Sequence, residues 1–409
     1  MVDWNETTLG DFISLQRGHD LPTATREKGD IPVMGSFGIT GSHSVARAKG
    51  PGVTVGRSGA SIGVVSYVDV DYWPLNTCLF ATDFHGNNPR FAYYFLQTLD
   101  LASHNSGSAQ PSLNRNYISP IRISVPDRKT QDHIAGFLGG VDDKIELNRR
   151  MNETLEAMAQ AIFRDWFVDF GPTRRKMEGA TDPVTILGGL IPTPDKAAPL
   201  AAVFPATLGD EGLPEGWEGK PLDEIATFLN GLALQKYPAD NPADSLPVIK
   251  IAELRNGVSA KSNRASRAVP DKYVIRDGDF LFSWSGSLMA KFWTEGEGAL
   301  NQHLFKVSSD DYPTWFYTQW VHKHLAEFQQ IAASKATTMG HIQRGHLKAA
   351  KTVCPSDDAW ELMGEVMEPI TQKTIQNDLE NRTLAATRDL LLPKLMSGEI
   401  RLRDVEAVA

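Results

Sequence analysis

Short runs of β-branched and aromatic residues, bounded by Gly, Pro and Asn turns, recur in two parts of the chain, residues 1–126 and 214–355. Runs of this kind predict strands. The clearest are GVTVG (52–56), GVVSYV (63–68), IRISVP (121–126) and FLFSW (280–284). Each part therefore predicts a domain of short strands mixed with helices, and we call the two parts the first and second heads.

Each head also contains a segment in which aromatic residues recur at helical spacing. In the first head Asn88 is placed as an N-cap and Pro89 as the first helical residue, and a similar start recurs around Pro313. The aromatic residues of each helix share one face: Phe91, Tyr94 and Phe95 in the first, Trp315, Tyr317 and Trp320 in the second. Apolar residues at helical spacing usually pack in a core, so we expect helices packed on sheets rather than base-stacking surfaces.

A heptad pattern follows each head. Between Gln131 and Phe167 there is no Pro, and the seam positions alternate in steps of four and three. They are Ile134, Leu138, Val141, Ile145, Asn148, Asn152, Leu155, Ala159, Ile162 and Trp166. The same seam recurs 229 residues later, at Met363, Met367, Ile370, Thr374, Asn377, Asn381, Leu384, Arg388, Leu391 and Leu395. At 1.5 Å per residue, about 36 residues make a rod of about 54 Å. Pro369 and Pro393 are expected to shape or kink the ends of the second helix.

Four asparagines occupy seam positions where a simple heptad has apolar side chains: Asn148, Asn152, Asn377 and Asn381. A buried asparagine lowers stability but fixes the register of a coiled coil. Antiparallel pairing of the two helices about a pseudo-twofold axis near residue 150 places Asn148 beside Asn381 and Asn152 beside Asn377.

The two seams belong to a duplication of the whole chain at a shift of 213 to 229 residues. LNTCLF (75–80) matches LNQHLF (300–305), and NRRMNETLEAM (148–158) matches NDLENRTLAAT (377–387). We expect an α+β fold in which two similar α/β domains are joined by two long helices that can bury their matching seams against each other. The expected divisions are 1–126 for the first head, 127–172 for the central helix, 173–213 for a Pro/Gly/Ala-rich connection, 214–355 for the second head, and 356–409 for the distal helix and tail.

The segments outside the heads and the seams have simple structural interpretations. Residues 173–213 are expected to be a linker or a lightly ordered excursion. The basic run at 174–176 is expected to be solvated rather than bound to phosphate. The acidic pairs at 142–143 and 357–358 are expected to act as helix caps.

Composition excludes several classes of protein. The net charge of −9 lies mainly in residues 127–213 and 356–409, and the heads are nearly neutral. Only Cys78 and Cys354 are present, so no disulfide framework or multi-cysteine zinc site is expected, and both thiols are expected to be buried. No apolar run is long enough to span a membrane, and the N-terminus does not resemble a signal peptide, which predicts a cytoplasmic protein.

Catalytic motifs are missing from the sequence. There is no G-x-x-x-x-G-K-[ST], G-x-G-x-x-G, H-E-x-x-H or Asn-Pro-Pro-aromatic motif. The nearest histidine pairs, His322 with His324 and His341 with His346, have no repeated ligand partners, so no metal site is expected. The chain is therefore expected to be non-catalytic by itself.

Three segments resemble the specificity subunit of prokaryotic type I restriction-modification systems. They are KIELNRRMNETLEAMAQAIFRDWFVDF (144–170), LPEGWEGKPLDEI (213–225) and NRTLAATRDLLLPKLMSGEIRL (381–402). The resemblance implies that each head is a target-recognition domain for one half of a bipartite site in double-stranded DNA. It also implies that the two target-recognition domains are separated by two long antiparallel helices forming a coiled coil, which sets the spacing and docks two methyltransferase subunits.

The same resemblance assigns the chemistry to partner subunits. S-adenosylmethionine, ATP and Mg²⁺ are expected in the methyltransferase subunits and in the restriction (translocase-nuclease) subunits, and no cofactor is expected in this chain.

Residues that contact DNA are expected to be polar, to lie on loops and to be placed alike in both heads. Two loops in each head meet this description. The candidates of the first head are Arg57, Ser58, Ser61, Gln110, Ser112, Asn114 and Arg115. Those of the second head are Trp284, Ser285, Ser287, Lys291, Lys335, Thr337, Thr338, His341, Gln343 and Arg344. Arg115 and Arg344 coincide at the shift of 229. Arg17, His19 and Lys236 are weaker candidates.

Two other classes of protein remain as alternatives. A scaffold with two protein-binding heads on a coiled coil explains the repeat, but it gives no reason for Gly/Ser-rich polar loops with Arg at one shift. A hydrolase or methyltransferase with an unfamiliar site has no group of residues to support it.

Overall fold

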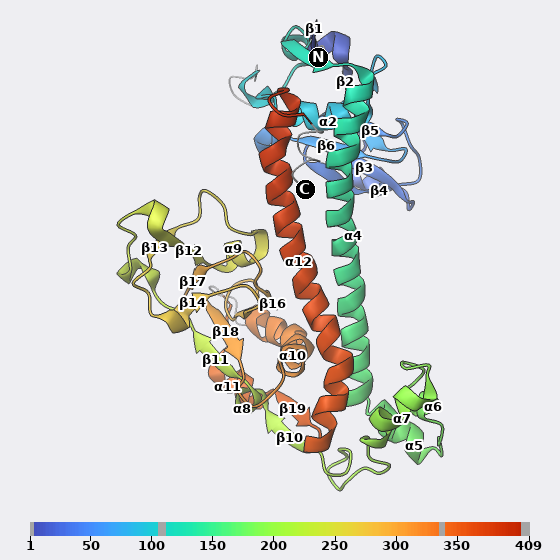
Figure 1. Cartoon of the computed structure of the whole chain (residues 1–409), viewed down its shortest axis with the longest axis vertical. Coiled ribbons are helices and arrows are strands. Elements are labelled where there is room, and N and C mark those ends of the chain that lie inside the picture. Colours follow the sequence, from blue (N-terminus) through green and yellow to red (C-terminus); the bar gives the residue numbers. More distant parts are fainter. Residues whose placement is uncertain (1–3, 105–111, 335–339, 402–409) are drawn as a thin grey trace. The chain divides into compact units, whose positions relative to one another are not determined.

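The structure is a computed structural model that describes residues 4–104, 112–334 and 340–401. The chain divides into two compact units, one formed by Met1–Ile145 with Thr383–Ala409 and the other by Glu146–Arg382. Both boundaries lie inside the long helices, so each unit holds one head and a part of each helix (Figure 1). The helices were expected to form regions of their own, but their side chains join the cores of the heads.

The first head forms three small sheets. Its strands are β1 (Trp4–Thr8), β2 (Ser14–Arg17), β3 (Ile31–Gly35), β4 (Gly38–His43), β5 (Gly52–Gly56), β6 (Val65–Val68), β7 (Trp73–Pro74), β8 (Cys78–Asp83) and β9 (Arg122–Pro126). Its short helices are α1 (Leu9–Phe12), α2 (Pro89–Gln97) and α3 (Arg115–Ile118). The strand orders are β2-β8-β5-β6, β4-β3-β7 and β1-β9. The predicted strands at 52–56, 63–68 and 121–126 are confirmed, with starts shifted by up to two residues.

The second head repeats this plan. Its strands are β10 (Glu218–Pro221), β11 (Thr227–Asn230), β12 (Ser245–Ile249), β13 (Arg264–Ser266), β14 (Val274–Ile275), β15 (Phe280–Ser283), β16 (Ala290–Phe292), β17 (Gly298–Leu300), β18 (Leu304–Ser308) and β19 (Lys351–Cys354). Its helices are α8 (Leu222–Ile225), α9 (Ile251–Asn256), α10 (Thr314–Ser334) and α11 (Arg344–Ala349). The order β11-β18-β15-β16 copies β2-β8-β5-β6, and the pair β10-β19 copies β1-β9. The duplication seen in the sequence is therefore a duplication of topology.

Gly18 and Gly231 match in the repeat because the backbone approaches them closely. A Cβ on Gly18 would lie 2.2 Å from the carbonyl oxygen of Leu75, and one on Gly231 would lie 2.3 Å from that of Asn301. Any other residue would have to displace backbone at this point. The close approach follows directly after β2 and β11, and it fixes where each of these strands ends.

Asn88 caps α2 as expected. Its side chain accepts hydrogen bonds from the backbone N–H groups of Arg90 and Phe91, with Pro89 in the first turn. The six aromatic residues that were expected to face a core are all buried: Phe91, Tyr94, Phe95, Trp315, Tyr317 and Trp320. Cys78 and Cys354 are buried free thiols, also as expected.

The two heptad seams lie on the long helices α4 (Arg128–Phe167) and α12 (Trp360–Met396). In the unit Glu146–Arg382 the helices run antiparallel, because Asn148 donates to Asn381 at 3.0 Å while Asn377 donates to Asn152 at 2.8 Å. These are the two pairs that the antiparallel register predicts. Pro369 and Pro393 lie inside α12, so neither ends it.

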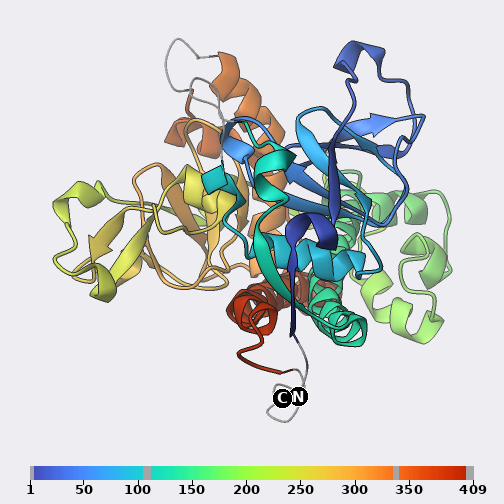
Figure 2. The ribbon, with the colours of Figure 1, turned by 90° about the horizontal axis from the view of Figure 1, so that it is seen from above.

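In the other unit the first head is joined to both helices by charged groups. Asp143 of α4 accepts two hydrogen bonds from Arg90 of α2, and the Arg90 guanidinium lowers the pKa of this carboxyl. Asp142 accepts hydrogen bonds from Tyr94 of α2 and Arg388 of α12. Figure 2 shows the N-terminal part of α4 beside the C-terminal part of α12. The expectation that Asp142 and Asp143 cap a helix was wrong, because α4 begins at Arg128 and both residues lie four turns into it. Asp357 and Asp358 do lie just before α12.

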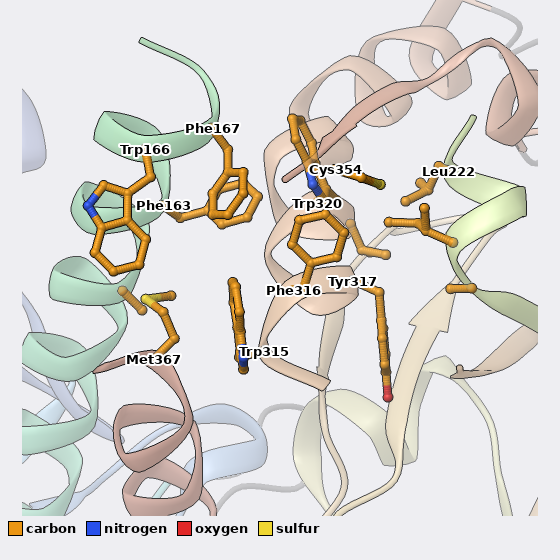
Figure 3. Close-up of a cluster of buried hydrophobic side chains, with 14 of the residues drawn as sticks. Phe163, Trp166, Phe167, Leu222, Trp315, Phe316, Tyr317, Trp320, Cys354 and Met367 are labelled. Carbon is orange, nitrogen blue, oxygen red and sulfur yellow. The ribbon is translucent and has the colours of Figure 1, made fainter. Parts of the chain in front are cut away.

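The second head is joined to its parts of the helices by an aromatic core (Figure 3). Phe163 and Phe167 of α4 contact Phe316 of α10, with ring centroids 6.4 and 5.4 Å apart. Met367 of α12 belongs to the same core. This core is one continuous cluster of large apolar side chains, and the attachment therefore depends on packing.

Residues 171–202 fold into three short helices, α5 (Gly171–Met177), α6 (Pro183–Ile186) and α7 (Pro194–Ala202). Ile186, Leu200 and Phe204 are buried with Trp166 in the core of the second unit. The expectation of a lightly ordered linker was therefore wrong for this segment. Each residue of the basic run at 174–176 donates a hydrogen bond within the protein. Arg174 donates to the Asp169 carbonyl, Arg175 to the Asp165 carboxylate and Lys176 to the Phe204 carbonyl.

Candidate nucleic-acid interface

Two polar loops of the first head lie side by side, although more than 50 residues separate them in the sequence. Ser58 and Ser112 form an isolated antiparallel bridge, and the Leu113 N–H donates to the Arg57 carbonyl at 2.8 Å. Ser61 lies in the short turn that follows Ser58. The loops that the sequence singled out separately therefore form one surface.

A hollow of about 350 Å³ opens where the two loops meet the end of β2. Its lining includes three arginines, Arg17, Arg57 and Arg115. The remaining lining residues are Gln16, Asn114 and the buried Leu79 and Leu113. The Asn114 side chain also caps α3, accepting from the backbone N–H of Asn116. Arg17, a weaker candidate in the sequence, thus joins the stronger candidates.

The three arginines have few hydrogen bonds of their own. The Arg57 guanidinium donates to the Asn76 carbonyl, and the Arg115 guanidinium donates to the Leu15 carbonyl, both at a long distance of 3.4 Å. Within the part of the chain that the structure describes, no carboxylate lies within ion-pair distance of Arg17, Arg57 or Arg115. Nine arginines elsewhere in the described residues have such partners, and others, such as Arg26 and Arg122, also have none. The nine are Arg90, Arg128, Arg150, Arg164, Arg175, Arg267, Arg276, Arg382 and Arg388. The hollow is distinctive because it gathers three arginines of the second kind in one place. Three uncompensated guanidinium groups around one hollow suit a ligand rich in hydrogen-bond acceptors.

The second head brings its loops together in the same way. Ser285 forms an antiparallel bridge with His341, and the Ile342 N–H donates to the Trp284 carbonyl at 3.0 Å. Arg344 donates to the Phe228 carbonyl at 3.4 Å, just as Arg115 donates to the Leu15 carbonyl. Arg115 and Arg344 are therefore structurally equivalent, as the shared shift predicted.

The chemistry at the equivalent position differs between the heads. Trp284 stands where the first head has Arg57, and its indole N–H donates to the side chain of Asn230 at 2.9 Å. Asn230 ends β11 as Arg17 ends β2. The Trp284 ring lies 6.0 Å from the Phe305 ring and 5.9 Å from the His303 ring. The second head therefore keeps one arginine of the three and gains aromatic surface.

The other candidates are distributed less evenly. Ser287 is exposed in the loop after β15, and Gln343 occupies the cap position of α11. His19 packs against Trp73 and Phe80, and Lys236 is exposed in a short turn. Four candidates lie outside the described residues: Gln110, Lys335, Thr337 and Thr338.

Lys291 does not belong to the loop. It is the middle residue of β16, paired with Leu281 of β15. Burial raises the pKa of the Glu156 and Asp378 carboxyls on α4 and α12, and the Lys291 charge acts in the opposite direction on both. The loop ends before Lys291, because β16 begins at Ala290. The charge of Lys291 therefore acts on carboxylates of the two long helices.

The family comparison agrees with the repeated organisation. A model of the type I restriction modification DNA specificity domain matches residues 1–157 and 214–385, which cover both heads and most of both helices. The chain belongs to this family. Residues 158–213, which contain the three short helices α5 to α7, lie outside the match.

Individual members of the family resemble the chain over most of its length. The specificity subunit of the type I restriction enzyme HindI from Haemophilus influenzae is 27% identical over 337 residues, which cover 73% of each chain. The MjaIX specificity subunit from Methanocaldococcus jannaschii is 22% identical over 77% of this chain and 70% of that one. The crystal structure of a type I S subunit from M. genitalium has the same fold, with a TM-score of 0.59, 15% identity and 96% coverage of both chains.

The described residues of this family member contain no group of three or more His, Cys, Asp or Glu side chains arranged to hold a metal ion. No helix in the same residues is long and apolar enough to cross a membrane.

Proposed function

We propose that this chain is the sequence-reading subunit of a type I restriction-modification complex, and that each head reads one half of a bipartite DNA target. The observation that carries this proposal is the repeated pairing of two polar loops, which in both heads brings an equivalent arginine, Arg115 or Arg344, to the same place. Two copies of one loop arrangement suit two similar pieces of duplex DNA.

The long helices set the distance between the half-sites and dock two methyltransferase subunits. Antiparallel pairing through Asn148 and Asn152 fixes the register on which that distance depends. Leu147 and Met158 of α4 are 54% and 45% exposed. Their positions are 11 residues apart, about three helical turns, so they share one face and offer apolar area to a partner.

The chain by itself carries out no methylation, ATP hydrolysis or DNA cleavage. S-adenosylmethionine belongs to the methyltransferase subunits, which must extrude the target base from the stack to modify it. ATP and Mg²⁺ belong to the restriction subunits that join the full complex. Tight binding of S-adenosylmethionine to the isolated chain in a calorimetric titration would overturn this division of labour.

The decisive experiment maps the methylated sequence in the host genome with and without this gene. Loss of one bipartite methylated sequence supports the proposal, and an unchanged methylation map contradicts it. Replacement of residues 1–126 by the first head of another family member then tests the division into halves. One half of the methylated sequence should change while the other stays.

A scaffold with two protein-binding heads predicts no change of the methylation map in either experiment. The uncompensated arginines argue against it, since a protein partner would have to supply several buried carboxylates in each complex.

A further inference from the structure

The strongest chemical contrast between the heads lies at the end of the second strand. The first head presents Arg17, Arg57 and Arg115 around one hollow, and the second presents Asn230, Trp284 and Arg344 at the equivalent places. The loops pair in the same way, so this difference concerns side chains rather than backbone.

We infer that the arginine hollow of the first head reads the major-groove edge of a guanine, and that the second head reads no guanine at the equivalent position. This inference rests on the proposed function. It assigns Arg17 and Arg57 of the first head, and Trp284 with Asn230 of the second, as specificity-determining residues.

Hydrogen-bonding capacity is the first argument for guanine. A guanidinium has five N–H donors, and Arg57 and Arg115 each use one of them in a long bond to a backbone carbonyl. The edge of guanine offers two adjacent acceptors, N7 and O6, which match an arginine fork. Adenine offers an acceptor beside a donor, and the donor would face another donor here.

The change of lining between the heads is the second argument, since duplex DNA has a second acceptor-rich group, the phosphate. The loops pair alike in both heads, yet Arg17 and Arg57 of the first head are replaced by Asn230 and Trp284 in the second. A contact to phosphate carries no sequence information, so a phosphate site gives no reason for this change of side chains. The hollow therefore favours a base edge.

The second head lacks the means to bind guanine in this way. The Trp284 N–H is already bonded to Asn230, and the guanidinium of Arg344 lies 5.9 Å from the centre of the Phe305 ring. The surface left beside Arg344 is aromatic, and apolar surface of this kind contacts the methyl group of thymine. The two halves of the target should therefore differ in base composition at this position.

The test uses the complex with its methyltransferase subunits and its mapped target. Each guanine of the first half-site is replaced in turn by 7-deazaguanine, which removes N7 and leaves every phosphate in place. One replacement should weaken binding of the unchanged complex by at least about 5-fold, the lower end of the range of about 5- to 150-fold for a bidentate base contact, because O6 stays in place. The same replacement should have little effect on the Arg57→Ala complex, whose contact is already lost.

Two variants separate a base contact from a phosphate contact. Arg57→Lys keeps the charge but not the fork, so it should lose the preference for guanine. Arg122→Ala is the matched control, because Arg122 is an exposed arginine on β9 of the same head and lies outside the hollow. It should leave the preference intact.

Two results would overturn the inference while leaving the proposed function standing. One is that 7-deazaguanine has no effect at any position of the first half-site. The other is that Arg17→Ala and Arg57→Ala weaken binding to all sequences equally, with a shallower salt dependence, which marks phosphate contacts. Failure of the proposed function looks different, because the complex would then show no preference for any bipartite sequence.

Discussion

Arg388 of α12 donates a hydrogen bond to Asp142 of α4 at 2.6 Å, and both side chains are about three-quarters buried, with 28% and 22% exposed. Removal of Arg388 leaves a carboxylate whose remaining side-chain donor, among the residues that the structure describes, is the Tyr94 hydroxyl. We expect Arg388→Ala to lower the free energy of unfolding by about 1–3 kcal/mol. Arg164→Ala is the matched control, since the exposed Arg164–Asp169 pair should contribute about 0–1 kcal/mol. Denaturant unfolding measures both, and equal effects would contradict the assignment.

Asn152 and Asn377 should be coupled. Both are buried, and Asn152 also donates to the Thr374 carbonyl and to Asp378. Asn152→Ala leaves these partners unsatisfied and should cost about 1–3 kcal/mol, whereas replacing both asparagines by Leu should cost less than the sum of the single changes. A double-mutant cycle measures the difference. Gln376→Ala, an exposed neighbour on α12, is the control, and additive effects would show that the amides act independently.

Arg115→Ala and Arg344→Ala should affect different halves of the target. If each arginine contacts a base edge, its removal costs about 1–3 kcal/mol on the cognate site and relaxes the preference at one position of one half-site. Binding to a panel of targets with single base changes separates the two halves. Relaxation of the same half by both variants would refute the assignment of one head to each half-site.

His322 should make the stability of the fold depend on pH. Its ring packs edge-on to Phe280, and burial lowers the pKa of His322 from 6.5 to about 4. The unfolded chain therefore takes up a proton near pH 6.5 that the folded chain refuses until about pH 4. The free energy of unfolding should fall as the pH is lowered through this window.

The effect can be isolated by substitution. His322→Gln should flatten the dependence of the unfolding free energy on pH between 6.5 and 4, and substitution of the exposed His104 by Gln should not. Parallel curves for the native chain and His322→Gln would show that another group is responsible.

Periodic and local features were predictable from the sequence. The heptad seams predict both long helices, because a heptad repeat specifies which face of a helix is buried. Together with antiparallel pairing, they also predict the contact of Asn148 with Asn381. The Asn88 cap depends on adjacent residues, and it was predicted for the same reason. The equivalence of Arg115 and Arg344 came from the duplication.

Features that depend on contacts between distant residues were not predictable. The sequence around Asp142 predicts only a cap, because its partner Arg388 lies 246 residues away. The Pro, Gly and Ala residues of the segment 173–213 predict a linker, and they hide the irregular spacing of Ile186, Leu200 and Phe204, which become a core only against Trp166. Arg17 gained importance only when β2 was placed beside the two loops.

The pair β1-β9 closes the first head, and β10-β19 closes the second. The first and last strands of each head are therefore paired, so the two ends of the head lie next to each other whatever residues lie between them. The second head holds more residues than the first within such a tie, as the change of shift from 213 to 229 shows. Residues between the paired strands can therefore be inserted, deleted or exchanged without moving the point at which the chain enters the helix that follows. This freedom extends to every part of a head except the side chains that pack on the helices.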